Sequence, residues 1–203
     1  MRSEIIWSKA LEVTKEAVDC GAIIPLDTTK YKSKEASCDY ELRFLKSPIP
    51  KYLREYGPKR NPFIPWDKRL EIQSIYKKHT VILNKYPVQI GHMLLITNKW
   101  KPQDGWLNIE DFKAIENVDK DTTGLWFFNS GPLAGASQPH RHIQLLRRDP
   151  SELSCPRENW ILDFSNANYK NKRLCKNIII KKFSKSFNDE NIYKIFHFCI
   201  FYY

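Results

Sequence analysis

Two spacings of apolar residues alternate along this chain and predict helices and strands in turn. Between residues 4 and 20, apolar residues recur at helical spacing among charged ones, which predicts an amphipathic helix ending near Gly21. Its apolar stripe comprises Ile5, Ala10, Leu11, Val13, Ala17 and Val18. A second helix is expected over residues 108–118, with Asp104 or Asn108 as its N-terminal cap. Its buried side would consist of Leu107, Phe112 and Ile115.

Short apolar segments between these helices and after them predict strands. They cover residues 40–45, 79–84, 92–97, 124–129 and 140–146. The first alternates like a half-buried strand, and Pro87 and Gly91 mark a hairpin-like turn between the second and the third. Residues 47–65 carry five prolines and should form a loop. Antiparallel strands with helices packed on one side of the sheet predict an α+β fold.

Polar side chains interrupt the last of these strands at every second position. Because side chains of an extended chain alternate between two faces, His140, His142 and Gln144 would all point the same way. The preceding residues 129–137 are rich in glycine and small side chains, so their backbone N–H groups could form an anion-binding concavity. A neutral imidazole can attack phosphorus near pH 7. This arrangement indicates chemistry on a phosphate group.

The segment Gly135-Ala136-Ser137-Gln138-Pro139-His140-Arg141-His142-Ile143-Gln144 resembles the His-x-His-x-Gln signature of the histidine-triad-like superfamily. The branch it resembles holds galactose-1-phosphate uridylyltransferase and the diadenosine tetraphosphate phosphorylases, also called ATP adenylyltransferases. Further blocks follow the order and spacing of the phosphorylases, at residues 61–63, 83–86, 92–97 and 129–132. The matching part runs roughly from residue 37 to residue 148.

This resemblance implies a histidine-triad-like fold and an enzyme that splits diadenosine tetraphosphate with phosphate into ATP and ADP. His142 would be the nucleophile that carries the adenylyl group, and the carbonyl of His140 would bind its other ring nitrogen. Gln144 would orient the phosphoryl oxygens without supplying a titratable proton. The other residues expected to bind the nucleotide and its phosphates are Lys46, Asn84, Lys85, Asn129, Gly135, Ala136, Ser137 and Gln138.

Other interpretations remain open. The enzyme could be a sugar-nucleotide transferase or a dinucleotide hydrolase of the same fold, or the chain could be a weakly active nucleotide-binding remnant. His140 and His142 could be structural, and with no Cys, Asp or Glu clustered near them we expect no metal site. Gly131 and Gly135 could be ordinary loop glycines, and Lys85 could be a solvated surface charge. His92 is expected to pack or to support the site from behind, and His79 to lie at the surface. No cofactor is required, apart from a divalent cation accompanying the nucleotide.

Composition limits the partners. The chain of 203 residues carries a formal net charge of +10, but most of this surplus falls in residues 166–203. The remaining body is mildly basic, which fits a small anionic ligand and gives no support to nucleic-acid binding. Five cysteines without Cys-x-x-Cys pairs are typical of a reducing cytoplasm. Without a signal peptide or a sufficiently long apolar run, we expect no membrane association. The oligomeric state is left open.

Residues 166–203 differ in kind from the rest of the chain. They are dominated by Lys, Asn, Ile, Phe and Tyr and contain neither Gly nor Pro. The family pattern also ends near Asn166. We therefore predict a catalytic domain over residues 1–165 and a divergent basic tail over 166–203, which is a truncated or frame-shifted C-terminal segment and contributes little to the site. The alternative is a divergent helix and strand that complete the domain.

Overall fold

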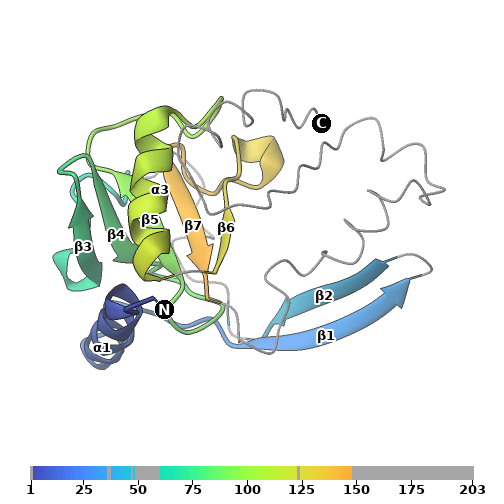
Figure 1. Ribbon diagram of the computed structural model, residues 1–203. Helices are drawn as coiled ribbons and strands as arrows, with labels where there is room; N and C mark the ends of the chain where they lie inside the picture. Colours follow the sequence, from blue (N-terminus) through green and yellow to red (C-terminus); the bar gives the residue numbers. More distant parts are fainter. Residues whose placement is uncertain (1, 36–37, 47, 49–59, 123, 148–203) are drawn as a thin grey trace.

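The structure is a computed structural model that describes residues 2–35, 38–46, 48, 60–122 and 124–147 (Figure 1). Its elements are α1 (Ile5–Asp19), β1 (Thr28–Glu35), β2 (Cys38–Leu45), the 3-10 helix η1 (Lys68–Leu70), β3 (Glu71–Ile75), β4 (His79–Leu83), β5 (Met93–Thr97), α3 (Ile109–Asp121), β6 (Leu125–Phe127), the 3-10 helix η2 (Pro132–Ala134) and β7 (His142–Leu146). One antiparallel sheet has the order β3-β4-β5-β7-β6, and β1 and β2 form a second sheet. The α+β prediction is confirmed.

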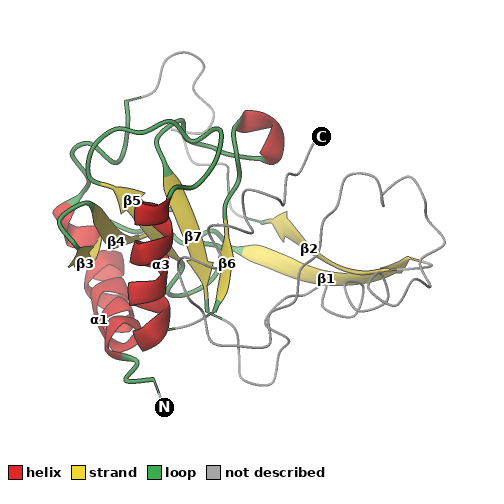
Figure 2. Ribbon diagram, turned by 45° about the horizontal axis from the view of Figure 1, so that its top comes forward, coloured by secondary structure: helices red, strands yellow, loops and turns green. Residues whose placement is uncertain are grey.

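Helix α3 lies across one face of the five-stranded sheet, and α1 packs against β3, η1 and α3 (Figures 1 and 2). Every residue of β4 and β5 is buried. Strands covered on both faces read as continuous apolar runs, which is why these two were predicted from the sequence at nearly their observed positions.

The start of α3 follows its predicted cap. The side chain of Asn108 accepts hydrogen bonds from the N–H groups of Glu110 and Asp111, and the carboxylate of Asp111 accepts one from the N–H of Asn108. This reciprocal capping box satisfies N–H groups that have no partner within the helix. Asn108 is therefore the cap, and Asp104 is not. The three residues predicted for the buried side are all buried: Leu107, Phe112 and Ile115.

The predicted apolar stripe of α1 is partly wrong. Ile5, Leu11 and Val18 are exposed, whereas the buried residues are Ile6, Ala10 and Ala17. The carboxylate of Asp121, at the end of α3, accepts hydrogen bonds from the N–H groups at the start of α1, including that of Ile6 at 2.7 Å. These hydrogen bonds fix the start of α1. The contact of α1 with β3 and η1 determines which side of the helix is buried.

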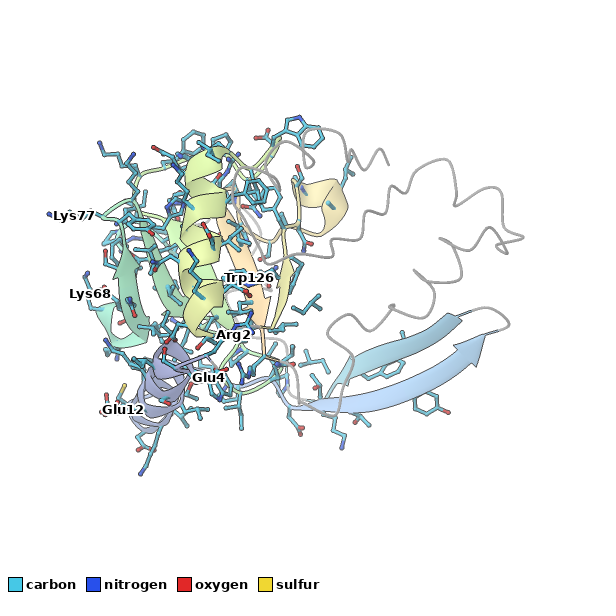
Figure 3. All side chains as sticks on the ribbon, in the orientation of Figure 1. Arg2, Glu4, Glu12, Lys68, Lys77 and Trp126 are labelled. Carbon is cyan, nitrogen blue, oxygen red and sulfur yellow. The ribbon has the colours of Figure 1, made fainter. Side chains whose placement is uncertain are left out.

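Two ion pairs hold the N-terminal residues, and Trp126 bonds to the acidic partner in one of them; Figure 3 labels Arg2, Glu4 and Trp126. Arg2 pairs with Asp119 at 3.0 Å, and the indole N–H of Trp126 on β6 donates to the same carboxylate at 3.1 Å. Glu4 pairs with Arg147 at 2.7 Å. Together these contacts join the beginning of the chain to α3 and to the end of β7.

Residues 40–45 lie in a strand, as predicted, but that strand is not half-buried. In β2, Leu42 is 42% and Phe44 59% exposed. The reason is that β2 pairs with β1 in a two-stranded arm that extends away from the main sheet (Figure 1). Among the residues that the structure describes, no core covers the alternating side chains of this strand. The strands β1 and β3 were not predicted.

Other predicted boundaries shift by a few residues. β7 begins at His142, while His140 precedes it in an isolated bridge with Pro102. β6 is shorter than the predicted 124–129. Within the predicted loop, residues 60–65 contain neither helix nor strand, and most of the loop lies outside the described residues. The predicted boundary at residue 165 and the tail 166–203 also lie outside them. No helix in the described part is both long and apolar enough to cross a bilayer.

Candidate active site

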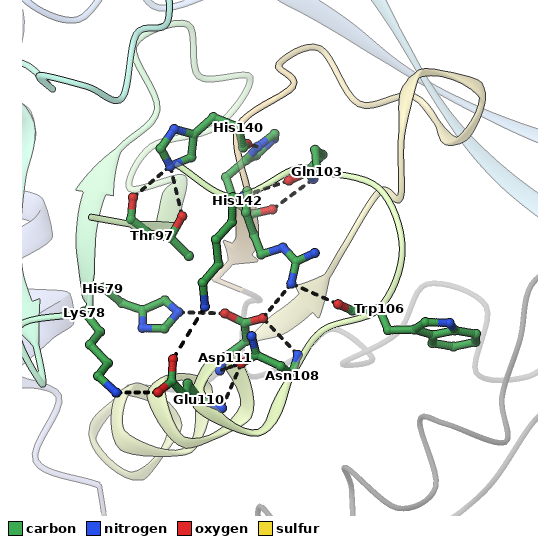
Figure 4. A network of polar contacts seen from close by, with 12 residues as sticks. Lys78, His79, Thr97, Gln103, Trp106, Asn108, Glu110, Asp111, His140 and His142 are labelled. Atoms are coloured by element: carbon green, nitrogen blue, oxygen red, sulfur yellow. Dashed lines mark hydrogen bonds and ion pairs between the residues drawn. The ribbon is translucent and has the colours of Figure 1, made fainter. Parts of the chain in front are cut away.

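Two of the three residues of the predicted row, His142 and Gln144, lie in β7 on the sheet face opposite α3, and His140 precedes the strand. Within β7, His142 is paired with Ile96 and Gln144 with Leu94 of β5. The side chain of Arg141, just before His142, points to the opposite face of the sheet. Its guanidinium lies 3.0 Å from the carboxylate of Asp111 on α3. His140 and His142 are both buried, and Figure 4 shows them near Thr97 and Gln103.

His140 is held in one tautomer by contacts on both ring nitrogens. Its Nε2 lies 2.8 Å from the backbone carbonyl oxygen of Thr97, which can only accept, so Nε2 carries the proton. Nδ1 then accepts a hydrogen bond from the amide of Asn61 at 2.9 Å. Burial lowers the pKa of His140, which favours this neutral form.

His142 is oriented by the residue two positions before it. Its Nδ1 lies 2.8 Å from the carbonyl oxygen of His140, so Nδ1 donates and Nε2 keeps its lone pair. Burial lowers the pKa of His142, and the neutral ring therefore prevails near pH 7. Phe63 packs its ring against both imidazoles, with centroid distances of 5.6 Å to His140 and 5.3 Å to His142. The result is a buried imidazole, fixed in one tautomer, with a lone pair on Nε2.

Gln103 holds the backbone of the same strand and was not among the predicted site residues. Its side-chain carbonyl accepts the N–H of His142 at 2.8 Å, and its amide donates to the carbonyls of His142 and Asn129. These bonds join β7 to the glycine-containing loop. Gln103 lies 39 residues from His142 in an irregular segment, so no local pattern marks it. Asn61 and Phe63 belonged to a recognised motif, but no role had been assigned to either of them.

The loop before the histidines closes on itself. Gly131 and Gly135 have φ values of 79° and 87°, which favour glycine. The N–H of Gly135 donates to Pro132, and that of Ala136 donates to Gly131, while the amide of Asn129 donates to the carbonyl of Gly135. Turn formation accounts for both glycines. Ser137 is exposed and Gln138 half-buried on the way to His140. A phosphate-binding role for this loop stays a prediction.

Asn84 joins the histidine row through His92, whereas the two lysines do not. The amide of Asn84 lies 3.3 Å from Nδ1 of His92, whose Nε2 lies 3.0 Å from the side-chain oxygen of Gln144. Lys85 is exposed, with its ammonium 5.9 Å from the ring of Tyr86. Lys46 is exposed at the end of the arm. Within the described residues, neither lysine contacts the histidine row, so their proposed roles stay predictions.

The prediction for His79 is wrong, since it is buried beneath the site. Its Nε2 lies 2.8 Å from the carboxylate of Asp111, which also binds Arg141 (Figure 4). Burial raises the pKa of Asp111, but hydrogen bonds from His79 and Asn108 and the charge of Arg141 outweigh it and hold the pKa below its usual value. Arg141 also donates to the carbonyls of Pro102, Asp104 and Trp106. This network ties α3 to the strand that carries His142.

Solved structures of yeast Ap4A (diadenosine tetraphosphate) phosphorylase Apa2 share this fold. The complex with Ap4A has a TM-score of 0.62 and 22% sequence identity, and the match covers 92% of this chain and 61% of that one. The complex with AMP has a TM-score of 0.60 and 24% identity over 75% of this chain and 54% of that one. These matches concern the fold, and the predicted histidine-triad-like fold is confirmed.

The family follows from the sequence comparison. The model of the Ap4A phosphorylase N-terminal domain matches residues 1–161, and the chain belongs to this family. Protein APA1 of Saccharomyces cerevisiae is 31% identical over 66% of this chain and 46% of its own length. Diadenosine 5',5'''-P1,P4-tetraphosphate phosphorylase 2 of the same yeast is 36% identical over 43% of this chain and 31% of its own length. The chain thus spans less than half the length of these two relatives.

Proposed function

We propose that this chain carries a nucleotidyl-transfer site that splits diadenosine tetraphosphate with inorganic phosphate into ATP and ADP. The observation that supports it most is the 2.8 Å hydrogen bond from Nδ1 of His142 to the carbonyl of His140, because it leaves Nε2 unprotonated. A relative with 36% identity is named as a diadenosine tetraphosphate phosphorylase. The nucleotide and phosphate as substrates, and a divalent cation accompanying them, belong to this proposal.

In the first step, Nε2 of His142 attacks an α-phosphorus of the dinucleotide. A nitrogen–phosphorus bond forms, the bond to the bridging oxygen breaks, and ATP leaves. The ring now carries a positive charge. The 2.8 Å hydrogen bond from Nδ1 to the carbonyl of His140 stabilises this charge. In the second step, a phosphate oxygen attacks the same phosphorus, ADP leaves, and Nε2 regains its lone pair.

Gln144 favours transfer to phosphate over the alternative of hydrolysis. Its carboxamide can donate a hydrogen bond to a phosphoryl oxygen but has no titratable proton to exchange with water. A polyphosphate leaving group needs no strong acid, so the first step does not require one.

Lys46 and Lys85 would act as point charges on the polyphosphate when it is bound. The cytoplasmic location expected from the cysteines stays a prediction.

Product analysis tests this function directly. The full chain is incubated with diadenosine tetraphosphate, with and without inorganic phosphate, and the nucleotides are separated by chromatography. ATP and ADP should form in equal amounts only when phosphate is present, and a matched His142→Ala variant should form neither. AMP released at a comparable rate in phosphate-free buffer would instead identify a hydrolase. A variant that keeps near wild-type turnover would remove His142 from the mechanism.

A further inference from the structure

A chain of hydrogen bonds runs from the backbone after β4 to Gln144, the last residue of the row that begins with His140 and His142. It begins at the N–H of Tyr86, which can only donate, and which lies 3.0 Å from the side-chain oxygen of Asn84. This contact leaves the amide nitrogen of Asn84 as the donor toward Nδ1 of His92, at 3.3 Å. Nδ1 of His92 is therefore the acceptor nitrogen, and the ring proton resides on Nε2.

The direction of this chain determines how Gln144 is turned. Nε2 of His92 lies 3.0 Å from the side-chain oxygen of Gln144, so the imidazole donates and the carboxamide accepts. A carboxamide whose oxygen is occupied in this way presents its NH2 group on the other side. The opposite orientation would place a carbonyl oxygen there, and a carbonyl oxygen repels the oxygens of a phosphate.

We propose that His92 is a positioning residue that locks the carboxamide of Gln144 with its NH2 group turned toward the phosphoryl oxygens, by means of the tautomer that Asn84 imposes. This inference rests on the proposed function, since it concerns how Gln144 assists the same transfer. Burial lowers the pKa of His92 to about 4, so a single neutral tautomer persists at neutral pH. The imidazole of His92 is buried, with 6% of the residue exposed.

The chemical consequence lies in the transition state. Negative charge builds on the phosphoryl oxygens as the bond to the nucleophile forms, and a fixed donor is worth most there. A carboxamide free to turn would spend part of its time in the repulsive orientation. Loss of the lock should therefore lower kcat and leave the KM for the dinucleotide nearly unchanged.

The matched variants are His92→Phe, which keeps a planar ring but removes the donor, and His92→Gln, which retains an N–H donor. Removing a group that orients a catalytic residue typically lowers activity by roughly tenfold to a hundredfold. We expect a fall of this size in kcat for His92→Phe and recovery of most of it in His92→Gln. Thermal melting of each variant shows whether it remains folded.

A double-mutant cycle with Gln144→Leu separates positioning from structural support. If His92 acts through Gln144, His92→Phe lowers kcat in the wild-type background and has no further effect in the Gln144→Leu background. Equal losses in both backgrounds would overturn the proposal, because a residue that only supports the fold does not depend on what Gln144 is.

Nuclear magnetic resonance of the full chain, labelled with 15N in its histidines, tests the tautomer without any need for activity. The ring of His92 should carry its proton on Nε2, and Asn84→Leu should weaken that preference. A proton on Nδ1 would reverse the hydrogen-bond chain and overturn the proposal. If the wild-type chain shows this tautomer but no phosphorolysis, the proposed function fails while the orientation of Gln144 stands.

Discussion

Acid should destabilise this fold well above the pH at which carboxylates titrate, because histidines are buried in their neutral form. His92 is the sharpest case, since burial lowers its pKa from 6.5 to about 4. The unfolded chain therefore binds a proton at this residue near pH 6.5, whereas the folded chain resists it until about pH 4. Stability is present in full above pH 6.5 and is lost as the pH falls through this window.

The size of the effect follows from the difference between the two pKa values. A shift from 6.5 to about 4 is worth roughly 3 kcal/mol once the pH is below both values. Between pH 7 and pH 5, the linkage relation assigns about 2 kcal/mol to His92 alone. Folded domains are stable by about 5–15 kcal/mol, so this loss is a substantial fraction. The pKa values of His140 and His142 are also lowered by burial, and both add to the loss.

Urea unfolding of the wild-type chain and of His92→Gln at pH 7 and pH 5 measures this contribution. Both pH values lie above the usual pKa of Asp and Glu, so carboxylates contribute little to the difference. The wild type should lose about 2 kcal/mol more than His92→Gln between the two pH values. Equal losses in the two proteins would refute the reasoning, since the variant lacks the group that titrates.

Three further substitutions test the site and its supports. His142→Gly should abolish phosphorolysis, and added imidazole should restore part of the turnover in a phosphate-dependent assay. Asp111→Asn should lower the free energy of unfolding by about 3 kcal/mol, because it leaves the buried guanidinium of Arg141 without its carboxylate; chemical denaturation measures this loss. Phe63→Ala should cost about 3–5 kcal/mol in the same assay and Phe63→Leu much less, whereas equal costs would mean that the ring does not fill the space beside the histidines.

The local sequence pattern was sufficient to predict strands that are buried at every position and polar side chains that recur at short spacing. The runs that became β4 and β5 are buried at every position, and Asn108 lies three residues before the carboxylate that completes its capping box. The spacing of His142 and Gln144 by itself predicts that both lie on one face of a strand. These features depend on neighbours within a few residues, which the sequence displays directly.

Other features depend on partners far along the chain. His79 is buried because Asp111, 32 residues later, accepts its hydrogen bond, and Gln103 holds the strand of His142 across 39 residues. The covered side of α1 is chosen by β3, η1 and α3, and β2 is exposed because it pairs outside the main sheet. The sequence by itself therefore determined the main core strands, the helix cap and the chemistry of the row. Only the tertiary structure decided which polar groups are buried and which tautomer each histidine adopts, because both depend on contacts between segments whose separation leaves no periodic trace.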